Sequence, residues 1–295
     1  MDEHTLLQLN AQGIIPGPSE TEEDFLKRAD YCLNLNQKIP ELMGDEPSFQ
    51  SDSFFQGPIQ ITANLFRIAP HWIPVYFSNY SLTPWHGGCA WIFQLSEDTP
   101  TAAMFQLRRT FRDSKKYLGI YDRDELISHE MAHVGRMMFE EPKFEEILAY
   151  RTSDSRFRRW LGPIVQSSVE SMLFVLILLM TFFFDLFLLF MQPEEFLKYS
   201  LWLKTIPLAV VGFALIRLWM RHRIFSQCWH RLDSLLKKEE FTNGIIYRLT
   251  DQEIYQFAKW NNFQISTYIE NEPSLRWKLI RKAYTDQRSG INAAP

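Results

Sequence analysis

Residues 127–136 read ISHEMAHVGR, and within them His129 and His133 stand four positions apart, with Glu130 directly after the first histidine. On an α-helix, positions i and i+4 share one face, so both imidazoles can reach a single ion. Catalytic zinc takes three protein ligands and keeps a fourth position for water, whose pKa it lowers from about 15.7 towards about 7. Glu130 could then remove a proton from that water at neutral pH. The spacing therefore predicts a hydrolytic zinc site, provided that a third ligand follows.

HEMAH followed by EEILAY resembles the HExxH zinc metallopeptidases whose third ligand is a glutamate on the next helix, the gluzincins. In such families this glutamate commonly stands three residues before a small alanine, as Glu146 stands before Ala149. The resemblance covers residues 85–155 and implies a zincin-like fold, with Glu130 as the general base of peptide hydrolysis. The zinc ligands that it implies are His129, His133 and Glu146.

The third ligand has competitors. Only twelve residues separate His133 from Glu146, fewer than in most gluzincins, so the first helix has to end soon after His133. Gly135 offers a break, and Pro142 enforces one because proline cannot continue a helix. Glu145 is the nearest competitor of Glu146. The other acidic residues that stay open as ligands are Glu140, Glu141 and Asp154.

Two further residues and one strand are candidates for substrate binding. Tyr150 and Arg136 could orient a ligand or stabilise an oxyanion, or else be structural hydrogen-bonding residues. Zincins usually hold the substrate as an added strand on a sheet edge beside the metal helix. GGCAWIFQL, residues 87–95, is the best candidate for that edge, since Gly87 and Gly88 allow close backbone approach; an ordinary core strand is the alternative.

The elements around the motif mix both types of secondary structure. Short aromatic and β-branched runs predict strands at 61–68, 72–80 and 87–95, whereas residues 101–121 favour neither type. Capping residues and apolar periodicity predict helices from Ser19 (with Phe25, Ala29, Cys32 and Leu33 on one face), over 122–141 starting at Asp122 or Asp124, over 143–160, and from Thr250. SLRWKLIRKAY, residues 274–284, is basic and amphipathic, and is expected to pack on the protein rather than on a membrane.

Two long apolar stretches predict that the chain is a membrane protein. SMLFVLILLMTFFFDLFLLFM, residues 171–191, carries one charge, Asp185, and is long enough to cross about 30 Å of hydrocarbon. In a second apolar stretch, residues 199–220, the uncharged part is shorter and lies between Lys204 and Arg217. The long side chains of these two residues can reach the membrane interfaces. No second ionisable residue is expected at the depth of Asp185, which argues against a transport pathway. The sequence predicts a transmembrane helical hairpin that continues into the helix RIFSQCWHRLDSLLKKEE.

Basic residues flank both ends of this hairpin. Arg151, Arg156, Arg158 and Arg159 precede it, and Arg217, Arg221, Arg223 and Arg231 follow or end it. The connecting loop holds Lys198 beside Glu194 and Glu195. The positive-inside rule then places both termini in the cytoplasm.

The amino-acid composition disfavours two other classes of protein, disordered proteins and nucleic-acid-binding proteins. Hydrophobic residues make up 46% of the 295 residues, which disfavours disorder, and a net charge of −4 gives no reason to expect nucleic-acid binding. Three widely spaced cysteines, Cys32, Cys89 and Cys228, are expected to be reduced thiols. The N-terminal residues are acidic and show no apolar signal-peptide core.

These patterns together predict an α+β zincin-like domain with a two-helix transmembrane hairpin and a helical C-terminal segment. The expected regions are a helical extension over 1–60, the metal-binding domain over 61–160, the hairpin over 165–222 and a cytosolic helical region over 223–295. The expected function is a membrane-anchored zinc metallopeptidase that hydrolyses protein or peptide substrates on the cytoplasmic side. A non-catalytic membrane protein that uses a zincin-like fold for partner binding is the alternative. The sequence leaves the substrate and the oligomeric state open.

Overall fold

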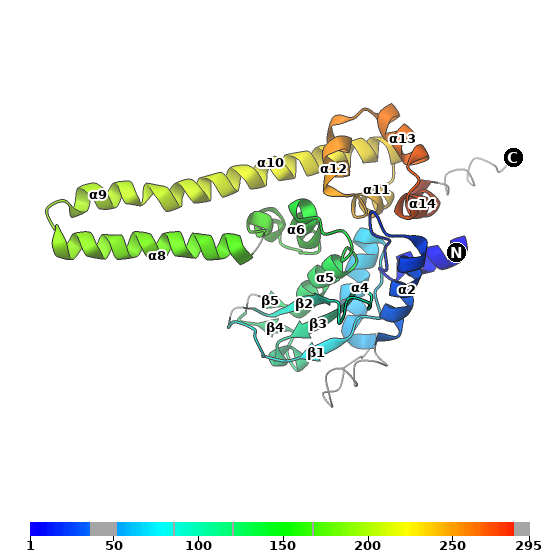
Figure 1. Cartoon of the computed structure of the whole chain (residues 1–295), viewed down its shortest axis with the longest axis horizontal. Coiled ribbons are helices and arrows are strands. Elements are labelled where there is room, and N and C mark those ends of the chain that lie inside the picture. The colour runs from blue at the N-terminus through cyan, green and yellow to red at the C-terminus, as the bar shows by residue number, and fades with distance from the viewer. Residues whose placement is uncertain (36–51, 85, 120, 167, 286–295) are drawn as a thin grey trace.

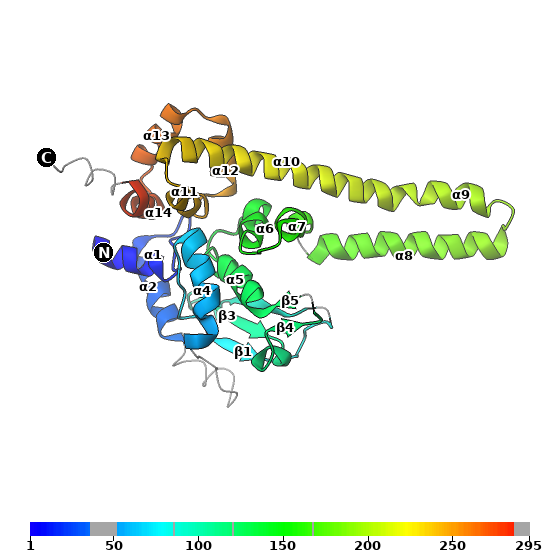
Figure 2. The same ribbon diagram turned by 180° about the vertical axis from the view of Figure 1, so that it is seen from behind.

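The structure is a computed structural model that describes residues 1–35, 52–84, 86–119, 121–166 and 168–285. It is mostly helical, with a small sheet and two long apolar helices that project side by side from the body of the protein (Figures 1 and 2). Helices from the N-terminal part of the chain contact the sheet and the metal-motif helix, and helices from the C-terminal part pack against those helices. The expected zincin-like fold stays a prediction.

The sheet has three strands in the order β1-β3-β2, namely β1 (Val75–Phe77), β3 (Ala102–Leu107) and β2 (Gly88–Phe93). β1 runs parallel to β3, and β2 runs antiparallel to it, with Gly88 opposite Leu107. A 3-10 turn (Arg109–Arg112) and a two-stranded ribbon, β4 (Lys116–Tyr117) with β5 (Tyr121–Asp122), follow. Residues 101–121, which the sequence left undecided, therefore contain a strand, a turn and part of a ribbon.

The predicted strand over 61–68 is wrong, because these residues belong mainly to the helix α4 (Asp52–Phe66). Phe55, Thr62 and Phe66 are buried and Ile59 is partly buried. Their spacing of three and four residues is the period of a helix, not of a strand. The boundary expected at residue 60 falls inside this helix.

The N-terminal helices are α1 (Glu3–Ala11) and α2 (Glu22–Leu33). The helix predicted from Ser19 begins instead at Glu22, because the Thr21 hydroxyl accepts the Asp24 N–H at 3.2 Å. Phe25, Ala29 and Cys32 are buried as predicted, whereas Leu33 is exposed.

The predicted helix over 143–160 is two helices, α6 (Pro142–Tyr150) and α7 (Arg156–Leu161), with the metal-motif helix α5 (Arg123–Val134) before them. The break falls where Ser155 caps α7 by accepting the Arg158 N–H. A 3-10 turn (Gly162–Ile164) then leads to the hairpin.

The hairpin consists of α8 (Ser168–Met191), the short α9 (Phe196–Leu203) and α10 (Thr205–Leu236). Both legs are long and apolar enough to cross a membrane, and most of their large apolar side chains are exposed. The expectation that Asp185 has no ionisable neighbour is wrong, because Lys204 Nζ lies 3.6 Å from Asp185 Oδ2. The position of the turn between α8 and α9 sets this pairing, because it determines which residues of the two legs of the hairpin lie opposite each other.

Two arginines hold the end of the hairpin that is nearer the rest of the protein. Arg217 forms a bidentate ion pair with Glu170, at 2.6 and 2.8 Å, and so joins the two legs. Arg221 donates to the carbonyls of Pro163 and Lys143, the second of which lies in α6. α10 continues beyond the apolar stretch to Leu236, as the sequence predicts.

The C-terminal region folds into α11 (Glu239–Ile246), α12 (Asp251–Lys259), α13 (Asn262–Asn271), α14 (Leu275–Ile280) and a π-helical turn (Arg281–Thr285). The capping box predicted at Thr250 is present, with Glu253 as its acidic partner. Trp277, Leu279 and Ile280 are fully buried, so the basic segment packs on the protein as predicted.

Candidate functional site

The helix α5 is fixed at its start and along one face. The Asp122 carboxylate accepts the N–H groups of Asp124 and Glu125 at 2.9 and 3.3 Å, an N-cap that stabilises the first turn. Ile127, Met131 and Val134, spaced by four and three residues, are buried in the core. The neighbouring face of the helix then carries the motif residues.

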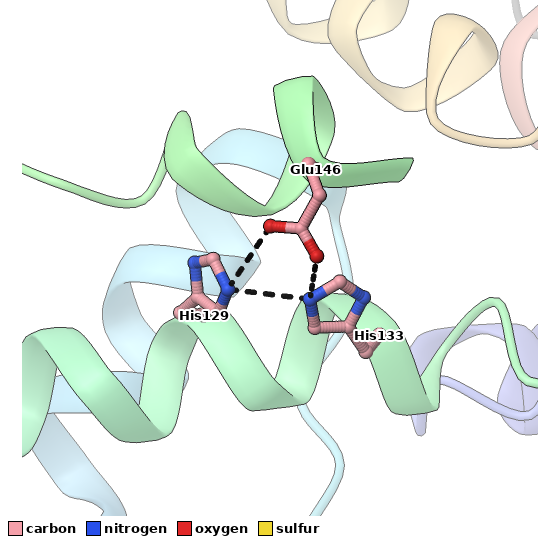
Figure 3. Close-up of side chains that lie close together, drawn as sticks. All are labelled: His129, His133 and Glu146. Atoms are coloured by element: carbon pink, nitrogen blue, oxygen red, sulfur yellow. Dashed lines mark hydrogen bonds and ion pairs between the residues drawn. The ribbon is translucent and has the colours of Figure 1, made fainter. Parts of the chain in front are cut away.

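The helix α6 crosses above α5 and is fixed in the same way. Pro142 occupies its first position, where the missing N–H is not needed. The next two N–H groups, of Lys143 and Phe144, donate to the Asp251 carboxylate at 2.9 and 3.2 Å. Because Phe144, Ile147 and Leu148 are buried, the remaining face turns towards α5 (Figure 3).

Figure 3 shows where the two helices bring their polar side chains together. The Nε2 atoms of His129 and His133 lie 3.2 Å apart. The Glu146 carboxylate reaches both, with Oε2 3.7 Å from His129 Nε2 and Oε1 3.6 Å from His133 Nε2. These three ligand atoms lie within 4.8 Å of one another, and the group could bind a metal ion.

Glu145 lies on the other side of His133 and does not point into this group. Its Oε1 is 3.1 Å from His133 Nδ1, and its Oε2 accepts the Arg136 Nε–H at 3.3 Å. An ionised Glu145 accepts the Nδ1 proton of a neutral His133 and leaves the Nε2 lone pair directed at the metal position. Glu145 is therefore positioned to orient the His133 ring.

The other acidic candidates lie elsewhere. Glu141 accepts the backbone N–H of Asp251, and Glu140 borders the same surface hollow as Glu141. Asp154 and Asp124 line a separate surface hollow near the start of α5. None of the three belongs to the group whose ligand atoms converge in the described part of the chain.

Arg136 is almost fully buried, at 1% exposure, behind His133. Besides Glu145, it donates to the backbone carbonyls of Tyr247 and Leu249. Arg136 therefore contacts Glu145 and the C-terminal region, and it does not line the cavity beside His129.

Burial and charge act in opposite directions on the two histidines. Burial, followed by the charge of His133, lowers the pKa of His129 to about 3. Burial alone would lower the pKa of His133 as well, but its hydrogen bond to Glu145 and the charges of Glu130 and Glu146 raise it to about 9. The carboxylates thus create a negative potential that favours a cation at His133 Nε2.

A cavity of about 520 Å³ opens beside the group. Its lining includes Gly87, Gly88, His129, Glu130, Tyr150 and Phe157. The Tyr150 ring stands edge-on to His129 with ring centroids 4.6 Å apart, and burial raises the pKa of its hydroxyl to about 12. Tyr150 is therefore a neutral hydrogen-bond donor next to the metal group at physiological pH.

Glu130 faces the cavity without joining the converging group. Its Oε2 accepts the backbone N–H of Ala90 at 2.8 Å, and burial raises the pKa of its carboxyl. Ala90 belongs to β2, which pairs only with β3 among the described residues, so β2 is an edge strand in that part of the chain. The strand expected to border the metal helix does so.

Sequence reasoning missed two contributors from beyond the hairpin. Tyr247 donates its hydroxyl proton to the Ala132 carbonyl at 2.7 Å, and Asp251 caps α6. The capping box at Thr250 marked the start of α12, but no local signal indicates that Asp251 faces α6, because more than a hundred residues separate the partners.

No protein-family model, no curated protein and no solved structure matches this chain. The functional assignment therefore depends on the geometry of this site and on the motif in the sequence.

Proposed function

We propose that this chain is a membrane-anchored zinc metallopeptidase, with His129, His133 and Glu146 as the zinc ligands. The observation that carries the proposal is the mutual distance of the three ligand atoms. Zinc–ligand bonds of about 2.0–2.2 Å give a tetrahedron with edges of about 3.3–3.6 Å. The two histidine nitrogens lie 3.2 Å apart, which is close to such an edge. Glu146 approaches them through different oxygens, Oε2 at 3.7 Å from His129 and Oε1 at 3.6 Å from His133, and with one oxygen as the ligand the three atoms lie within 4.8 Å of one another. Zinc binding would therefore require only a small shift of the Glu146 carboxylate.

Zinc, when bound, supplies Lewis acidity, which polarises a substrate carbonyl and acidifies water. Glu130 is the general base: its carboxylate faces the cavity, and the raised pKa that burial gives it makes it a stronger proton acceptor. Ala90 N–H holds one carboxylate oxygen in place and leaves the other for the proton. Tyr150, as a neutral donor, is suited to stabilise an oxyanion on the substrate.

The edge strand β2 supports a polypeptide as the substrate. An extended peptide can add to a free strand edge through main-chain hydrogen bonds. Gly88 lines the cavity, and packing against β3 keeps it a glycine, because a Cβ there would lie 2.5 Å from the Gln106 carbonyl oxygen and 2.8 Å from the Leu107 side chain. Zinc, Glu130 and the strand edge would then all face one substrate chain.

The apolar hairpin supports anchoring in a membrane. Its exposed apolar side chains would form an unfavourably large apolar surface in water, whereas lipid tails would cover it. The basic residues that precede and follow the hairpin support a cytoplasmic location of the two termini and of the metal site, by the positive-inside rule.

The test is zinc content and proteolysis of the full chain, purified in detergent, with labelled casein as a general substrate. Wild type is expected to hold about one zinc per chain, because three protein ligands and one water complete the coordination of a single ion. His133→Ala should lose zinc and hydrolysis, whereas Glu130→Gln should keep zinc and lose hydrolysis. His230→Ala, an exposed histidine on α10, is the matched control and should change neither.

Three outcomes would contradict the proposal in different ways. Zinc that is unaffected by His133→Ala would mean that the metal, if present, lies elsewhere. Hydrolysis that persists in Glu130→Gln would mean that Glu130 is not the general base and that the proposed mechanism is wrong. Wild type that binds zinc but hydrolyses nothing would favour partner binding.

A further inference from the structure

The short helix α7 exposes aromatic side chains next to the start of the hairpin. Phe157 is 70% exposed and Trp160 is 46% exposed, and their spacing of three residues places them on one face. Val165 and Val169, further along the chain, are also exposed and lead into α8. The apolar surface of the hairpin thus continues onto α7.

α7 is held in this position rather than hanging freely. The His222 ring stacks on Trp160, with centroids 6.3 Å apart, and its Nε2 lies 2.8 Å from the Trp160 carbonyl oxygen. Arg221, the preceding residue of α10, donates to the Pro163 carbonyl at 2.8 Å. The exposed aromatic face is therefore fixed relative to α10, one of the two long helices of the hairpin (Figure 2).

Charged side chains accompany these aromatic residues. Arg156 and Arg159 are exposed on α7. On the other leg, the Arg223 guanidinium lies 5.5 Å from the ring centre of Trp219. Tryptophan with nearby arginine is typical of the headgroup layer, where the ring is amphipathic and the cation meets anionic lipid. Tryptophan and arginine therefore occur together on α7 and on the part of α10 nearer the body.

We propose that α7 lies in the headgroup layer of the bilayer, with Phe157 and Trp160 facing lipid and Arg156 and Arg159 facing anionic headgroups. This inference rests on the proposed membrane anchoring. Phe157, Leu161 and Ile164 also line the cavity at the metal group. The cavity mouth therefore opens at the membrane surface, and its substrates are polypeptide segments that lie there, such as the part of a membrane protein next to its span.

The test places one environment-sensitive fluorophore per variant on a single cysteine of the full chain. Phe157→Cys reports on α7, Phe183→Cys on the exposed middle of α8, and Tyr80→Cys on an exposed loop residue after β1. Cys89→Ala is the background, because Cys32 and Cys228 are buried. Each variant is reconstituted in phosphatidylcholine vesicles with about one quarter phosphatidylglycerol, an anionic lipid.

Quenching by lipids spin-labelled near the headgroup or deep in the tails then gives the depth of each fluorophore. Position 157 is expected to be quenched several-fold more by the shallow label than by the deep one, position 183 mainly by the deep label, and position 80 by neither. If position 157 behaves like position 80 while position 183 is quenched, the hairpin is inserted and the placement of α7 is wrong. If position 183 also escapes quenching, membrane anchoring itself is wrong, and the inference fails with it.

Discussion

Replacing Glu145 with glutamine tests whether a residue that does not touch the metal controls how tightly the metal is held. In the structure, Glu145 joins His133 Nδ1 at 3.1 Å to Arg136 Nε at 3.3 Å. Glutamine keeps the length of the side chain and an oxygen that can still accept the Nδ1 proton. It removes the negative charge, which both raises the basicity of His133 and balances the buried Arg136.

The expected magnitude follows from what each substitution leaves in place. Loss of a carboxylate behind a metal-bound histidine lowers metal affinity by about 10–100-fold, or roughly 1.4–2.7 kcal/mol. Because Glu145→Gln retains one acceptor, we expect the lower end, and we expect the upper end for Glu145→Ala. Glu146→Gln removes a ligand and should lower the affinity far more than either. The order of affinities is therefore wild type, Glu145→Gln, Glu145→Ala, Glu146→Gln.

The measurement is zinc affinity by competition with a chromophoric chelator, together with the visible spectrum of the cobalt form. The spectrum of a four-coordinate cobalt ion should persist in both Glu145 variants, since their ligand set is unchanged, and should be lost in Glu146→Gln. Thermal unfolding without added metal provides the control for folding. A loss of affinity in Glu145→Ala that merely follows a loss of the fold would not count as support.

Two results would refute the reasoning. Wild-type affinity in Glu145→Ala would show that the carboxylate does not orient His133. A lost cobalt spectrum in Glu145→Gln combined with a retained one in Glu146→Gln would show that the two neighbouring glutamates have exchanged roles.

Three further predictions concern the parts of the fold that support the site. Glu253→Gln should lower the free energy of unfolding by about 3–5 kcal/mol, because it leaves Arg276 buried without its carboxylate. Burial opposes the ionisation of Glu253, but the charge of Arg276 and the hydrogen bonds from Arg276, Thr250 and Trp277 together outweigh burial and lower the pKa. The stabilisation by Glu253 is therefore present above the unfolded pKa of about 4.3 and is lost as the pH falls further. Thermal unfolding of wild type should therefore show a larger acid-induced drop than the glutamine variant. Gly135→Ala places a Cβ 2.2 Å from the Tyr247 hydroxyl and should destabilise by about 1–3 kcal/mol, and adding Tyr247→Phe should recover part of that loss in a double-mutant cycle. Asp251→Ala removes two hydrogen bonds from the start of α6 and should reduce stability by about 1–3 kcal/mol in chemical unfolding.

The parts that could be predicted from sequence are those with a local physical signal. The Asp122 cap and the i, i+4 histidines fix one face of α5, and Pro142 forces a new helix. The apolar length of the hairpin needs no tertiary information either, because bilayer thickness alone sets it. In these places the sequence determines position within one or two turns of a helix.

Glu145 and Glu146 show why the remainder was out of reach. Neighbouring residues on a helix point about 100° apart, so only one of them can reach the Nε2 atoms of both His129 and His133. The choice depends on which face of α6 is buried. Phe144 of that face packs against Phe225 of α10 and Tyr255 of α12, which come much later in the chain. The same applies to Lys204 and Asp185, whose pairing depends on where the hairpin turns.

The metal helices are supported from the far side of the hairpin in sequence. Tyr247 holds the Ala132 carbonyl of α5, Arg136 holds the carbonyls of Tyr247 and Leu249, and Asp251 caps α6. These contacts join both metal helices to one short stretch, residues 247–251. Because this stretch contacts both α5 and α6, we expect the mutual distances of the histidines and Glu146 to depend on it, and so on the hairpin that returns the chain to the body. The arrangement of these three side chains would then be coupled to the folding of the hairpin, although none of them lies in it.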